Sequence, residues 1–221
     1  MVSRHRNRYY EISSKLTAIP VTIATLSLVI FFTISASAQQ SKNAFEPLSA
    51  RELVSLKNKQ AIVSSNNGQF VGRIRVDASV ATAWQVLTDY DNLESFFPYV
   101  ETSRLLRSVG NRRIFEQVNI VQIFSVSHRS RVVVEAIESY PQKIGFRLVE
   151  GDMNSLQGSW QIEPIPNASG RSPTQTLIVH KVNLSPKGGR AAREIFFATY
   201  SKILEDTLVA IKQETEKRVR R

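Results

Sequence analysis

Hydrophobic and polar residues alternate along much of the chain after residue 68, a pattern typical of β-strands. The first alternating segment, residues 69–76, places its apolar side chains on one side of a strand. Residues 80–88 then carry apolar residues at helical spacing, and residues 91–97 can form a second short helix that Pro98 ends. The pattern therefore predicts one strand followed by two short helices.

After Pro98 the alternating pattern continues for nearly ninety residues. Turn-forming residues such as Gly110-Asn111, and the break at Tyr140-Pro141, divide this stretch into separate strands. We expect six strands, at residues 100–106, 113–120, 125–137, 143–150, 157–165 and 174–184.

One long helix is predicted at the end of the chain, from about residue 190 to residue 218. Its apolar residues recur at spacings of three and four and form a single stripe. Antiparallel strands joined by short turns can curl around one long helix if that helix presents one apolar face. We therefore predict an α+β fold, in which a curved antiparallel sheet of about seven strands surrounds a long C-terminal helix.

Residues 1–38 have the pattern of a signal peptide or a membrane anchor. Basic residues precede an uncharged run from Leu16 to Ala38, and small residues surround a potential cleavage point after Ala38. At 23 residues the run is also long enough to span a bilayer. Both alternatives predict that the rest of the chain is exported or membrane-anchored, on the extracytoplasmic side.

Two regions follow this segment. Residues 39–67 are interpreted as a linker with one short helix near residues 49–58, where Ser49 and Glu52 have the spacing of a capping box. Residues 68–221 are predicted to form the main domain.

Charge and cysteine content narrow the classes of function. The net charge is +10, and without residues 1–38 it is +7, which favours anionic surfaces such as lipid headgroups. Nucleic acid is the other partner that a basic protein suggests, but here the basic residues are interleaved with acidic ones. We therefore predict no nucleic-acid partner. The chain has no cysteine, which excludes disulfides, thiolate metal sites and a cysteine nucleophile.

The sequence shows no strong catalytic motif. His128 and His180 lie on separate predicted strands without a carboxylate nearby in sequence, so we expect strand histidines without a ligand role and no metal site. A nucleophile elbow, a P-loop and a dinucleotide-binding glycine motif are also absent. Hydrolase, kinase and dehydrogenase activities are therefore not expected, and no cofactor is predicted.

Several short motifs occur in a familiar order and spacing: Val76-Asp77-Ala78 before residues 83–90, Phe96-Phe97-Pro98, and Gly158 to Pro164 before the closing helix. With these motifs the chain, over about residues 69–217, resembles the START-like (SRPBCC) superfamily, in its polyketide cyclase/dehydrase or coenzyme Q-binding protein branch. The resemblance implies the helix-grip (START/Bet v 1-like) fold, with a cavity between the curved sheet and the closing helix. Members of the superfamily use this cavity for lipids, quinones, hormones or polyketides.

The resemblance and the apolar stripe together give candidate site residues. We expect the cavity wall to include Trp160, Phe196, Tyr200, Ile203, Leu204 and Thr207. The leading hypothesis is a monomer that binds or transports an apolar small molecule, such as a lipid or an isoprenoid quinone. Residues 96–99 either contact a membrane surface or form a hydrophobic plug on the core.

Two other hypotheses stay open. An aromatase/cyclase that acts on a polyketide-like substrate needs a positioned acid or base in the cavity. A structural or partner-binding protein instead fills the cavity with its own side chains. The sequence leaves open which face of strand 113–120 lines the cavity, and cross-strand ion pairing on the outside is the alternative explanation for the charged strand residues. The candidate acids and bases are Glu116, Glu135, Arg129, Arg131, Arg147 and Tyr200.

Overall fold

The computed structural model describes residues 48–123, 125–166 and 174–220. The predicted signal peptide or anchor at residues 1–38 lies outside the described residues. Within the described ranges, no helix is long and apolar enough to span a membrane.

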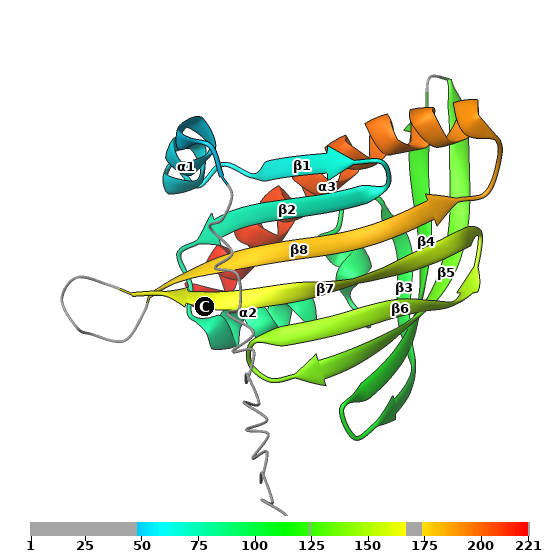
Figure 1. The fold of residues 1–221 in the computed structure, drawn as a ribbon. Coiled ribbons are helices and arrows are strands. Elements are labelled where there is room, and N and C mark those ends of the chain that lie inside the picture. The colour runs from blue at the N-terminus through cyan, green and yellow to red at the C-terminus, as the bar shows by residue number, and fades with distance from the viewer. Residues whose placement is uncertain (1–47, 124, 167–173, 221) are drawn as a thin grey trace, which may run out of the picture. The chain divides into compact units, whose positions relative to one another are not determined.

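Eight strands in the described part of the chain form one antiparallel sheet that curves strongly (Figure 1). Their order across the sheet is β1-β2-β8-β7-β6-β5-β4-β3, so the last strand pairs with the second one. The strands are β1 (Ile62–Asn66), β2 (Gln69–Val76), β3 (Val100–Val109), β4 (Arg112–Ile123), β5 (Val126–Ser139), β6 (Lys143–Gly151), β7 (Met153–Ile165) and β8 (Gln175–Pro186).

The helices confirm the predicted order of elements. The short helix α1 (Ala50–Lys57) begins at a capping box, in which the Ser49 backbone N–H donates to the Glu52 carboxylate at 2.8 Å. Helix α2 (Val80–Leu87) and the 3₁₀ turn η1 (Leu93–Ser95) connect β2 to β3, and α3 (Arg190–Val219) follows β8. The architecture is the predicted α+β fold, with a curved antiparallel sheet and a long C-terminal helix.

The sheet has one strand more than we predicted. Strand β1 lies within residues 39–67, which the sequence analysis assigned to the linker, and it pairs with β2 through the two-residue turn Asn67-Gly68. Both turn residues have positive φ, 44° and 86°, as hairpin turns of this length favour. The strand escaped prediction because Ile62-Val63 are followed by three small polar residues, which give no alternating signal.

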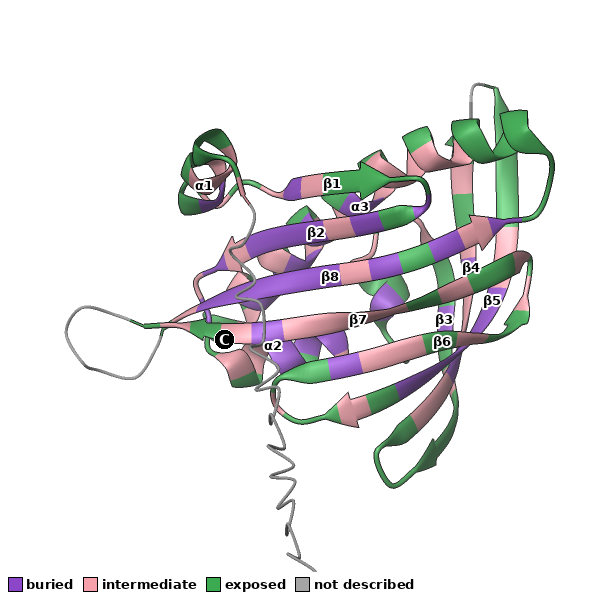
Figure 2. Ribbon diagram, in the orientation of Figure 1, coloured by how far each residue is buried: buried purple, intermediate pink, exposed green. Residues whose placement is uncertain are grey.

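Strand β8 is covered on both faces, as its buried residues show in Figure 2. On one face, Leu177 and Val179 pack with Leu56 of α1 and Ile62 of β1 in a small cluster. The other face belongs to the main core, which contains buried residues of α2, α3 and most strands. The covering on both sides explains why the consecutive residues Leu177, Ile178 and Val179 are all apolar and buried.

Helix α3 comes very close to β2 at Gly72. A Cβ atom at this position would lie 2.8 Å from Cδ1 of Leu208 and 3.1 Å from Leu204. Both leucines are buried, so any side chain at residue 72 would push the helix away from the sheet. The main contacts of α3 with strands are to β1, β2 and β8, which lie in one half of the sheet.

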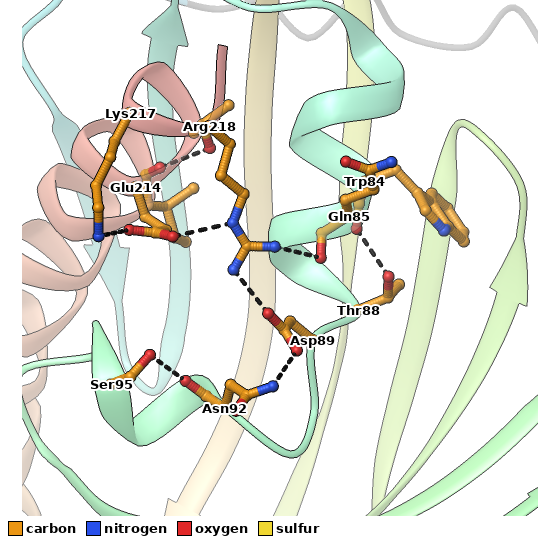
Figure 3. Close-up of polar contacts among 11 residues, drawn as sticks. Trp84, Gln85, Thr88, Asp89, Asn92, Ser95, Glu214, Lys217 and Arg218 are labelled. Atoms are coloured by element: carbon orange, nitrogen blue, oxygen red, sulfur yellow. Dashed lines mark hydrogen bonds and ion pairs between the residues drawn. The ribbon is translucent and has the colours of Figure 1, made fainter. Parts of the chain in front are cut away.

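The end of α3 is joined to α2 and its following turn by Arg218 (Figure 3). The Arg218 guanidinium donates to Glu214 at 2.9 Å and to Asp89 at 2.7 Å, and it lies 5.7 Å from the centre of the Phe96 ring. Burial alone would raise the pKa of Glu214, but hydrogen bonds from Lys217 and Arg218 lower it below its ordinary value. Glu214 is thus held as a carboxylate in a largely buried position.

We predict that Arg218→Met lowers the free energy of unfolding by about 2 kcal/mol, because it leaves Asp89 without its cation and Glu214 with Lys217 alone. Urea denaturation at neutral pH measures the change. Arg220→Met is the matched control, since Arg220 is exposed and donates only to a backbone carbonyl, at 3.3 Å. Equal unfolding midpoints for the two variants would contradict the prediction.

Candidate functional site

A cavity of about 180 Å³ lies in the interior of the described domain. Its wall comes from α2, the segment that follows it, the strands β3 to β8, and α3. None of the described residues that line it carries a formal charge at neutral pH. They are Leu87, Tyr90, Leu93, Phe97, Tyr99, Val100, Phe115, Gln117, Asn119, Val134, Ala136, Ile144, Phe146, Leu156, Trp160, His180, Tyr200, Ile203, Leu204 and Thr207.

The cavity shows which face of β4 points inward, a question that the sequence left open. Phe115, Gln117 and Asn119 line the cavity, so the alternate residue Glu116 lies on the opposite face. The amides of Gln117 and Asn119 give this part of the wall a polar character.

The charged residues considered as acids or bases form ion pairs away from the cavity wall. Glu116 and Glu135 each pair with two arginines across neighbouring strands, on the outer face of the sheet, which confirms the alternative explanation by ion pairing. These residues are absent from the cavity wall, which leaves Tyr200 from the original candidates. The pairs are Arg131–Glu116 (2.6 Å), Arg104–Glu116 (3.4 Å), Arg112–Glu135 (2.7 Å), Arg147–Glu135 (2.6 Å) and Arg129–Glu101 (2.6 Å).

Five of the six predicted cavity residues line the cavity: Trp160, Tyr200, Ile203, Leu204 and Thr207. Phe196 does not; it packs against the core, with its ring stacked 5.8 Å from the ring of Tyr200. The Thr207 hydroxyl donates to the carbonyl of Ile203 at 2.7 Å, so it is occupied within the helix. Contact of these residues with a ligand stays a prediction.

Two tyrosines in the wall were not among the predicted site residues. The hydroxyl of Tyr90 donates to Glu138 at 3.0 Å, and that of Tyr99 donates to Asp206 at 2.6 Å. Burial, with the Glu138 charge beside it, raises the pKa of Tyr90, and the hydrogen bond to Asp206 raises that of Tyr99. Both hydroxyls therefore have acceptors within the protein.

The segment between η1 and β3 also contributes to the wall, through Phe97 and Tyr99. Phe96 and Phe97 pack against the main core, with their rings 5.1 Å apart. This placement agrees with the hydrophobic plug that the sequence analysis gave as one alternative for residues 96–99. Contact with a membrane stays a hypothesis.

His180 is a wall residue to which the sequence analysis gave no ligand role. It is only 5% exposed and lies between two aromatic rings, with Phe146 at 5.4 Å and Trp160 at 3.9 Å. Burial lowers the pKa of His180 to about 3, so the imidazole is neutral at physiological pH. Its position on the same strand face as the buried Ile178 and Val182 was the available signal.

The arrangement favours binding of an apolar molecule over acid–base chemistry. Burial also raises the pKa of Tyr200, so Tyr200 and His180 are poor proton carriers near neutral pH. Among the residues that the structure describes, no group of His, Asp or Glu side chains is placed to hold a metal ion.

Comparisons with known proteins agree with this geometry. The model of the family described as polyketide cyclase/dehydrase and lipid transport matches residues 76–210, more than half of the chain. A search of the curated proteins found no match.

Solved structures share the fold at low sequence identity. A protein from Thermus thermophilus is similar over 68% of this chain and 98% of its own, with 15% identity and a TM-score of 0.58. The Zhui aromatase/cyclase from a Streptomyces species is similar over 68% and 94%, with 17% identity and a TM-score of 0.57. A STAR-related lipid transfer protein from Xanthomonas axonopodis is similar over 70% and 92%, with 17% identity and a TM-score of 0.54.

The buried His180 predicts a pH dependence of stability. Because its pKa in the folded state is about 3, below the ordinary 6.5, the unfolded chain takes up a proton first as the pH falls. Above pH 6.5 the lowered pKa of His180 has no effect on stability. Between pH 6.5 and about pH 3, each pH unit of acidification reduces the free energy of unfolding by up to about 1.4 kcal/mol.

Urea denaturation between pH 7 and pH 5 tests this expectation. His180→Phe should make the loss of stability over this range smaller than in the wild type, whereas His128→Phe, at an exposed position of β5, should leave it unchanged. The same pH dependence in the wild type and in His180→Phe would show that His180 is not held neutral by burial.

Proposed function

Because the chain belongs to the polyketide cyclase/dehydrase and lipid transport family, we propose that it binds and carries an apolar small molecule in the cavity beside α3. The observation that carries this proposal is the wall itself, which consists of apolar, aromatic and neutral polar side chains. Such a wall with a few polar groups is typical of ligand-binding pockets. The third hypothesis, an interior filled by its own side chains, lacks support because a cavity remains.

The cavity volume limits the part of the ligand that the protein encloses. An engineered cavity of about 150 Å³ takes up benzene, so about 180 Å³ holds one ring with a short substituent. A lipid or an isoprenoid quinone therefore places its ring or chain end inside and extends beyond this space, or side chains of the wall move. Burying about six methylene equivalents contributes roughly 5 kcal/mol before the cost of association.

The alternative function, an aromatase/cyclase for a polyketide-like substrate, takes its support from the family and from the fold shared with the Zhui aromatase/cyclase. General acid–base catalysis works best with a pKa close to the operating pH. Burial moves both pKa values away from neutral pH: it lowers the pKa of His180 and raises the pKa of Tyr200. We therefore place carriage of a ligand ahead of cyclisation.

The N-terminal segment adds an inference about location, namely that the binding domain works on the extracytoplasmic side as an exported or membrane-anchored protein. We predict that N-terminal sequencing of the protein isolated from its native cell gives Gln39 as first residue if the segment is cleaved. A retained anchor gives an intact N-terminus in the membrane fraction instead. An intact chain in the soluble cytoplasm contradicts both.

Cavity filling tests the proposed function. We predict that Ala136→Phe weakens binding of naphthalene, measured by its fluorescence, at least about ten-fold, because the new ring occupies the space of the ligand. Ile137→Phe is the matched control: Ile137 is the next residue of β5, is 38% exposed and points to the outer face, so binding should be unchanged.

Native mass spectrometry with extraction of the bound material provides a second measurement. We expect a co-purifying apolar molecule in the wild-type protein and less of it in Ala136→Phe. A wild-type protein that is empty after purification and does not bind naphthalene refutes the proposed function.

A further inference from the structure

One buried polar atom in the cavity wall has no hydrogen-bond partner. Nδ1 of His180 is buried and unpaired within the described residues. Arg75 Nε is the other such atom there, but Arg75 does not line the cavity. Buried polar groups in folded proteins are nearly always hydrogen-bonded, so an unpaired one in the wall of a cavity indicates a partner that enters the cavity.

The neighbours of His180 explain why the protein itself supplies no partner. Across the strands, His180 lies opposite Gly72 of β2 and Trp160 of β7. Gly72 has no side chain, and Trp160 presents its ring to the imidazole, as Phe146 does from β6. Aromatic packing thus fixes the plane of the imidazole and leaves its hydrogen-bonding capacity unused.

His180 lines the cavity, so a ligand in the cavity would lie beside this ring. A half-turn of the imidazole about χ2 exchanges the places of Nδ1 and Cδ2 and returns the ring to the same plane. The half-turn therefore moves Nδ1 to the other edge of the ring while the ring stays between Phe146 and Trp160.

The chemistry of a neutral imidazole indicates the group that would pair with it. One nitrogen carries a proton and donates, and the other accepts. A hydroxyl group can both donate and accept, so it suits either nitrogen, whereas a carbonyl suits only the protonated one and a hydrocarbon suits neither. We infer that His180 selects apolar ligands that carry a hydroxyl group, through a hydrogen bond to its imidazole. This inference rests on the proposed function, since it requires a ligand in the cavity.

Naphthalene and 2-naphthol are suitable probes, because they differ only by a hydroxyl group and their flat rings suit a wall that contains several aromatic side chains. The affinities of both are measured for the wild type and for His180→Phe, which keeps a ring between Phe146 and Trp160. The preference of the wild type for 2-naphthol over naphthalene should exceed that of the variant by about ten-fold. Comparing the two preferences cancels the different hydration of the probes.

A second measurement uses only the wild-type protein, so it does not depend on whether His180→Phe folds. In wild-type protein labelled with ¹⁵N-histidine, 2-naphthol should shift the imidazole nitrogen signals of His180 several times more than naphthalene does. The signals of the exposed His128 provide an internal reference.

The outcomes separate this inference from the proposed function. If both probes bind, but the preference is the same in the wild type and in His180→Phe, or the His180 signals respond equally to both probes, the selection by His180 is refuted and carriage of a ligand stands. If the wild type is empty after purification and binds neither probe, the proposed function and this inference are refuted together.

Discussion

The close packing of α3 against β2 is the contact on which the rest of the domain depends. Gly72 lets Leu204 and Leu208 reach the sheet, and Arg218 holds the end of the helix to Asp89 after α2. The buried residues of α3 all belong to its C-terminal half, from Leu204 onward. Earlier in the helix, Tyr200 and Ile203 are only partly buried and line the cavity. This less buried part of the helix therefore supplies part of the cavity wall.

The alternation of the strands separates the charges of the protein from its ligand space. On β4, Glu116 points outward to two arginines while its neighbours Phe115 and Gln117 point inward. On β5, the same holds for Glu135 between Val134 and Ala136. A register shift of one residue would bring these carboxylates into the cavity. The paired ions therefore help to hold the register that keeps the interior uncharged.

The sequence predicted the elements better than the site, for physical reasons. The bounds of β2 were predicted without error because only Val71 departs from the alternation there, and α3 followed from its stripe. Strand β1 was missed because it carries only two apolar residues. The inward face of β4 stayed open because both faces mix apolar and polar residues. His180 was judged a strand histidine without a ligand role, because the sequence places no carboxylate near it and does not show which side chains of other strands surround it. Its burial between Phe146 and Trp160 depends on strand pairing that only the structure shows.

The burial that makes the cavity suitable for an apolar molecule also works against acid–base chemistry inside it. Removing water from His180 and Tyr200 disfavours their charged forms, so the imidazole loses basicity and the phenol loses acidity. A cyclase built on this fold would need a charge near one of these groups to reverse the shift. On β4 and β5, Glu116 and Glu135 are bound to arginines on the other face, and Glu138 accepts from Tyr90 and pairs with Arg113. The neutral imidazole can still donate or accept a hydrogen bond. Within this wall, recognition of a ligand is the function that the physical chemistry favours.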